Sequence, residues 1–99
     1  MSEQVRIGDI LANPDNYVNK RVIIIAEYLG WGAGDCNLLN TSMRTRSDVT
    51  LKDETGCIFS DFINGLDPAS KKKVKIEAEV EIYQGKPRLR DPKLLEVLD

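Results

Sequence analysis

Residues 48–62 read DVTLKDETGCIFSDF, and this stretch decides the fold. Two β-prone segments lie on either side of the acidic turn Asp53-Glu54-Thr55-Gly56. Asp53 suits the first position of a type I turn because its carboxylate accepts hydrogen bonds from backbone N–H groups two residues on. Gly56 supplies the positive φ that closes a short bulged loop. The stretch therefore predicts a β-hairpin.

The segment from residue 73 to residue 83 predicts a long strand with one buried side. Charged side chains alternate there with apolar ones, which are Val74, Ile76, Ala78, Val80 and Ile82. Residues 21–31 are rich in β-branched side chains and predict an earlier strand. Residues 88–98 predict the last strand, in which Pro92 marks either a bulge or a sheet edge.

The predicted connections are short, with one exception. Residues 6–13 predict a short helix that stops before Pro14. Residues 65–72 predict a single helical turn with Asp67 as its N-cap. The exception is a loop, rich in Gly, Asn, Ser and Thr, that starts at Gly30 and ends near Ser47, and loops of this length are often functional.

These elements predict an all-β fold with small helical content. Five strands follow one another, with a hairpin between the second and third, a short helical connection before the fourth and a tight turn before the fifth. This is the order of a five-stranded Greek-key barrel of the OB-fold type. We expect one domain over residues 1–99, with the short helix at about 6–13 and the barrel at about 20–98.

The hairpin also carries a family resemblance. Its pattern Leu51-x-Asp53-x-Thr55-Gly56-x-Ile58 is similar to the Leu-x-Asp-x-Thr/Ser-Gly-x-Ile hairpin of anticodon-binding-like and replication-protein-A-like OB domains. The resemblance covers roughly residues 20–98. It implies a non-catalytic protein that binds single-stranded DNA or RNA. In that family the ligand lies on the outer face of the second and third strands, between the first loop and the last turn.

Composition limits the other classes of function. The chain has 99 residues, of which 41% are hydrophobic and 30% charged, and its net charge is −2. Its longest apolar run, residues 22–26, is far shorter than the roughly 20 residues of a membrane-spanning helix, and the N-terminus has no secretory pattern, so we expect a cytoplasmic protein. Because non-specific nucleic-acid binders are usually basic, a local positive patch would have to supply the affinity.

The residues typical of other chemistries are few. The chain has no histidine to act as a general base, and Asp53 and Glu54 are explained by the turn, so we expect neither an enzyme nor a catalytic residue. We expect no metal site and no cofactor. Cys36 and Cys57 lie 21 residues apart and are expected to be free thiols, with a disulfide or a metal pair as the alternative.

Ten residues are candidates for nucleic-acid contacts. Residues 42–52 hold three cations against one carboxylate, residues 84–93 hold four against one, and the outer face of the hairpin adds an aromatic ring. Aromatic rings stack on bases and cations neutralise phosphates. The candidates are Trp31, Arg44, Arg46, Thr50, Lys52, Phe59, Tyr83, Lys86, Arg88 and Arg90.

Several alternatives stay open. If the hairpin register slips by one residue, Phe59 lies in the core and Ile58 is exposed. Trp31 is alternatively explained as a partly buried rim residue, and Tyr83 as a residue that covers the side-chain stems of its neighbours. The alternative for the arginines is a solvated rim. The competing function is a protein-interaction module that docks a partner through an edge strand or through the acidic row of the long strand, which is Glu77, Glu79 and Glu81.

Overall fold

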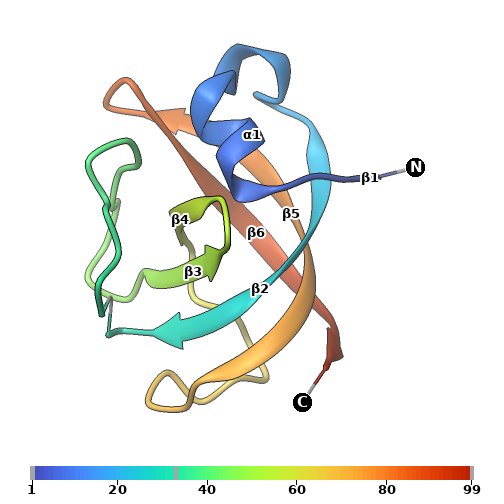
Figure 1. The fold of residues 1–99 in the computed structure, drawn as a ribbon, viewed down its shortest axis with the longest axis vertical. Coiled ribbons are helices and arrows are strands. Elements are labelled where there is room, and N and C mark those ends of the chain that lie inside the picture. Colours follow the sequence, from blue (N-terminus) through green and yellow to red (C-terminus); the bar gives the residue numbers. More distant parts are fainter. Residues whose placement is uncertain (1, 33, 99) are drawn as a thin grey trace.

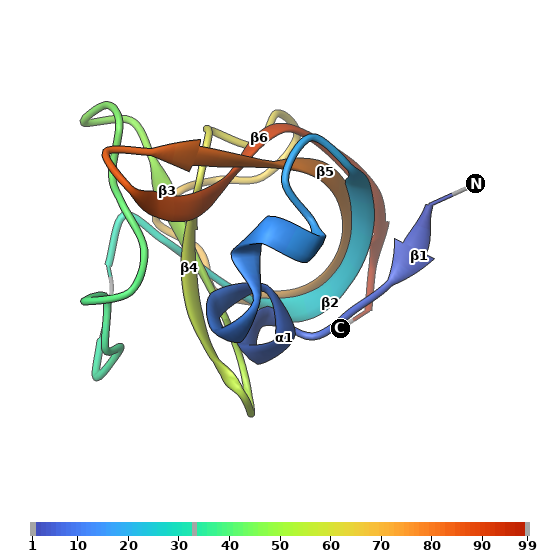
Figure 2. The ribbon, with the colours of Figure 1, turned by 90° about the horizontal axis from the view of Figure 1, so that it is seen from above.

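A computed structural model describes residues 2–32 and 34–98 and shows a closed five-stranded β-barrel (Figure 1). A short helix lies over one end of the barrel, as the view from above makes clear (Figure 2). The elements are β1 (Glu3–Gln4), α1 (Ile7–Ala12), a 3-10 helix (Pro14–Asn16), β2 (Arg21–Gly30), β3 (Val49–Asp53), β4 (Gly56–Ser60), β5 (Lys72–Tyr83) and β6 (Lys86–Val97). None of the helices in the described residues has the length and apolar character that crossing a membrane requires.

Strand pairing closes the barrel. The sheet order is β1-β2-β3-β4-β6-β5, and β5 returns to pair with β2. β4 and β6 run parallel and meet where Ser60 pairs with Leu89. β1 adds a short parallel strand beside β2. Without β1, this is the strand order of the OB-fold, so the predicted fold class is confirmed.

The hairpin has the predicted register. Leu51 pairs with Ile58 and Thr50 pairs with Phe59. The side chains expected to point inward are completely buried, namely those of Val49, Leu51, Ile58 and Ser60. Phe59 therefore lies on the outer face, as one of the two predicted registers requires.

Asp53 fixes the turn of the hairpin and also holds α1. Its Oδ1 accepts the N–H groups of Thr55 at 2.7 Å and Gly56 at 3.1 Å, and its Oδ2 accepts the N–H of Ile7 at 2.9 Å. The carboxylate thus satisfies donors of the turn and one of the unpaired N–H groups at the start of the helix. Ile7 and Ile10 of α1 are fully buried in the core at that end of the barrel.

The structure corrects the predicted helical turn at residues 65–72 and settles the nature of the irregularity predicted at Pro92. Residues 65–72 contain turns in place of the predicted helical turn, and the chain is already extended at Lys72. The Asp67 carboxylate still accepts the N–H of Ala69 at 2.9 Å, as expected of an N-cap, and the turn is closed by the Ser70 N–H, which donates to the Asp67 carbonyl oxygen at 2.9 Å. Glu77 of β5 pairs with Lys93 of β6, whereas Glu79 of β5 pairs with Arg90 of β6. Between these pairs β6 therefore carries one residue more than β5. The proline-marked irregularity is therefore a bulge.

Candidate nucleic-acid interface

The loop between β2 and β3 crosses the outer face of the β3–β4 hairpin and contacts the β5–β6 hairpin. Thr41 Oγ1 donates to the carbonyl oxygen of Pro87 at 2.7 Å and accepts the N–H of Phe59 at 3.2 Å. Ser42 Oγ lies within hydrogen-bond distance of the carbonyl oxygens of Tyr83 and Lys86. The two segments that were expected to flank a groove are thus in direct contact.

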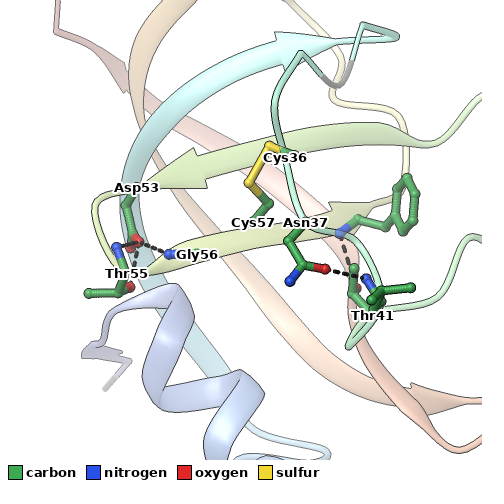
Figure 3. The surroundings of a disulfide bond; sticks show 9 residues. Cys36, Asn37, Thr41, Asp53, Thr55, Gly56 and Cys57 are labelled. Atoms are coloured by element: carbon green, nitrogen blue, oxygen red, sulfur yellow. Dashed lines mark hydrogen bonds between the residues drawn. A yellow bond between two sulfur atoms is a disulfide. The ribbon is translucent and has the colours of Figure 1, made fainter.

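A disulfide joins this loop to β4, so the expectation of two free thiols is wrong (Figure 3). Cys57 lies on the outer face of β4, opposite Lys52 in the ladder, and the loop passes over it. The Cα atoms of Cys36 and Cys57 are 5.9 Å apart, well within the range of a disulfide. A spacing of 21 residues carries no signal for this contact, because the loop path decides it.

Arg88 lies at the centre of a buried ionic network. Its side chain is 0% exposed. Nη2 donates to Asp48 Oδ2 at 2.8 Å and to Asp61 Oδ1 at 2.8 Å, and Nη1 donates to Glu81. The guanidinium therefore joins β6 to the loop, to the segment after β4 and to β5. In this arrangement Arg88 has no surface to offer a phosphate.

Within the network, Asp61 and Arg88 favour each other's ionised form. Burial alone would raise the pKa of the Asp61 carboxyl, but the hydrogen bonds and charge of Arg88 outweigh it and lower that pKa. Burial alone would likewise lower the pKa of Arg88, but its hydrogen bonds to Asp61, Glu81 and Asp48 raise it. Each partner thus stabilises the charge of the other.

Two further candidate arginines are paired at the surface. Arg44 Nη2 lies 3.0 Å from Asp61 Oδ1, and its side chain is 42% exposed. Arg90 donates to Glu79, and its Nη1 lies 3.5 Å from Glu81 Oε1. Exposed ion pairs of this kind contribute about 0–1 kcal/mol, so a phosphate can replace such a carboxylate at small cost.

Three further candidates for nucleic-acid contact, Trp31, Arg46 and Lys86, are exposed to solvent. Trp31 is 61% exposed, and its indole N–H donates to the carbonyl oxygen of Ser47 at 3.4 Å. Arg46 in the loop and Lys86 at the start of β6 are exposed, and neither makes an ion pair among the described residues. Tyr83 is half-buried at the end of β5.

The outer face of the hairpin is covered for part of its length. Thr50 is 3% exposed and Phe59 is half-buried, so neither is fully open to a ligand. Lys52 is exposed; it pairs with Cys57 on the outer face of the hairpin and also lines a cavity of about 480 Å³ beside β1 and β2. The cavity has mixed charge; its lining includes Arg6, Lys73, Glu27 and Glu54.

The role of the carboxylates that hold Arg88 was not predicted from the sequence. Asp48 was expected only to offset the loop cations, yet it is 3% exposed and accepts hydrogen bonds from the N–H of Arg44 at 2.7 Å and from the Arg88 guanidinium. Its position directly before a buried strand was the one available signal. No group of three or more His, Cys, Asp or Glu residues in the described part of the chain is arranged to hold a metal ion.

Comparisons of the chain with protein-family models, with curated proteins and with solved structures find no match. The case for a function thus depends on the site itself.

Proposed function

We propose that this protein binds single-stranded nucleic acid, weakly and with little sequence preference, on the surface where the loop meets the β5–β6 hairpin. We call this the loop–hairpin surface, and it comprises Trp31, Arg44, Arg46, Tyr83 and Lys86. The observation that carries the proposal is the set of hydrogen bonds from Thr41 and Ser42 to the hairpin carbonyls. These bonds join two segments that supply aromatic rings and cations from distant parts of the sequence.

The chemistry of this surface suits an extended polynucleotide. The exposed indole of Trp31 offers a face for one base, and Arg46 and Lys86 offer charges for phosphates. Arg44 can exchange Asp61 for a phosphate oxygen. With about three cations in contact, the logarithm of the binding constant should fall with the logarithm of salt concentration with a slope of about −2.

The test uses the only tryptophan of the chain as its signal. A thymidine oligonucleotide of about ten nucleotides is titrated while Trp31 fluorescence is followed at low and at high salt. We expect saturable quenching that weakens as salt is added. No change in Trp31 fluorescence at micromolar protein in low salt would overturn the proposal.

Two lysines of β6 provide a matched pair of variants. Lys86 belongs to the loop–hairpin surface, whereas Lys93 pairs with Glu77 further along the strand. Lys86→Ala should weaken binding several-fold and reduce the salt slope by about 0.7, the contribution of one phosphate contact. Lys93→Ala should leave both unchanged. Equal losses in the two variants would show that only the overall charge matters, and not this surface.

A further inference from the structure

We infer that the Cys36–Cys57 disulfide is a redox latch over a second base-stacking face, which lies around Phe59 on the outer side of β3 and β4. The inference rests on the proposed function, because the face is assigned to the same polynucleotide. In the oxidised protein the loop–hairpin surface is open and the second face is covered. Reduction of the disulfide uncovers it.

The latch holds one part of the loop and not the other. Residues 34–40, which we call the arm, make no hydrogen bond to the barrel among the described residues, so the disulfide is their one bonded attachment. The next segment is anchored independently by Thr41, by Ser42 and by the Asp48 carboxylate. Breaking the disulfide therefore releases the arm while residues 41–48 keep their contacts.

The arm passes over Cys57, which lies two residues before Phe59 on the same face of β4. Cys57 is only 5% exposed although it is on that face, and the loop carrying Cys36 passes across it (Figure 3). Its neighbours on the face are Lys52, which is its partner in the ladder, and the pair formed by Thr50 and Phe59. A half-buried aromatic ring with a cation close by on the same face is the combination that holds a stacked base and its phosphate.

The sequence of the arm suits a segment that moves. Leu39 is 74% exposed, and the only side-chain hydrogen bond recorded within the arm joins the Leu39 N–H to Asn37 Oδ1 at 3.0 Å. Gly34 has a positive φ of 57° and open space around its Cα. Few buried contacts and few bonds to the core are the properties of segments that open at low free-energy cost.

The switching step is a thiol–disulfide exchange with a dithiol reductant. A thiolate of the reductant attacks Cys36 Sγ, the less buried of the two sulfurs, and forms a mixed disulfide while Cys57 leaves as a thiolate. The second thiol of the reductant then displaces Cys36. The products are two protein thiols and the oxidised cyclic reductant, so two electrons and two protons pass to the protein.

The first experiment needs no nucleic acid. Wild-type protein is digested briefly with chymotrypsin, with and without dithiothreitol, and cleavage after Leu38 and Leu39 is followed by mass spectrometry. Reduction should speed this cleavage about tenfold or more, because the arm opens locally. Tryptic cleavage after Arg44 and Arg46 should stay constant, since that segment keeps its anchors. Unchanged cleavage of the arm overturns the latch.

The second experiment measures the affinity for the oligonucleotide in both redox states. Reduction should tighten binding about tenfold, the gain expected from one more stacked base. Phe59→Leu should abolish this gain and leave the oxidised affinity intact. Cys36→Ser, assayed in dithiothreitol, should bind as the reduced wild type does and should not respond to removal of the reductant.

The two proposals fail in different ways. Binding by the oxidised protein together with no change on reduction overturns the latch and leaves the proposed function standing. A reduction-induced gain that persists in Phe59→Leu also overturns the assigned face. Absence of binding in both redox states overturns the proposed function and the second stacking face together, even where chymotrypsin shows that the arm is released.

Discussion

At the scale of single residues, Arg88 connects more of the molecule than any other candidate cation. Its guanidinium has charged partners on the loop, after β4 and on β5, while its Nε is buried without a hydrogen-bond partner in the structure. Good pairing geometry is needed for such a network to stabilise the fold, because it must offset the cost of removing the guanidinium and three carboxylates from water. Its position under the loop makes it a scaffold for the loop–hairpin surface.

We predict that Arg88→Ala lowers the free energy of unfolding by about 3–5 kcal/mol, since it leaves the buried Asp48 carboxylate without its cation. Arg90→Ala is the matched control, because Arg90 is a half-exposed neighbour whose ion pairs should be worth about 0–1 kcal/mol. Urea denaturation followed by Trp31 fluorescence measures both. Equal costs in the two variants would contradict the network described above.

Asp61 gives the stability of the fold a pH dependence. Its pKa in the folded protein is lowered by Arg88 despite burial, so its contribution is complete above the unfolded value of about 4 and is lost as pH falls through the folded value. Asp61→Asn should therefore lower stability at neutral pH and flatten its decline below about pH 4. Asp35→Asn, at an exposed loop position, should leave the decline as steep as in the wild type.

At the scale of elements, the strands could be predicted and the loop could not. The alternation along residues 73–83 and the turn chemistry of Asp53 are local properties, so they predict β5 and the hairpin, while the choice between the two registers of the hairpin came from the structure. The loop path depends on contacts between distant residues, such as Thr41 with Pro87 and Cys36 with Cys57. No local pattern encodes them, which is why the covered face and the disulfide were missed.

The end of β2 offers a test of how closely two elements approach. Gly30 has a φ of 63°, and a Cβ there would lie 1.8 Å from the carbonyl oxygen of Pro68, which accepts the N–H of Trp31 at 3.2 Å. Gly30→Ala should cost clearly more than the roughly 1–2 kcal/mol of left-handed backbone strain. Gly34→Ala, with a φ of 57° but nothing within 4 Å, should cost that strain alone. Thermal unfolding of both variants measures the difference.

At the scale of the whole molecule, closure of the barrel determines what the loop does. β4 and β6 pair only where Ser60 meets Leu89, and the Thr41 side chain links both strands there by bonding to Phe59 and Pro87. The loop thus completes a weak seam of the barrel and covers part of the ligand face at the same time. The sequence indicated the seam through its strand order. Of the charges expected to form a groove beside it, Arg88 is buried in the ionic network, while Arg44 and Arg90 are paired with carboxylates at the surface.

The disulfide should stabilise the whole chain without being required for the fold. In the chain-entropy account, closing a loop of about 20 residues restricts the unfolded state by about 3 kcal/mol, whereas the core of the barrel is formed by a cluster of buried side chains that includes neither cysteine. We predict that dithiothreitol lowers the free energy of unfolding by about this amount and leaves the far-ultraviolet circular dichroism unchanged at 25 °C. Cys36→Ser should have the lower stability with or without reductant. A reduced wild type that is unfolded in the absence of urea would contradict the prediction, because the barrel would then depend on the latch that covers it.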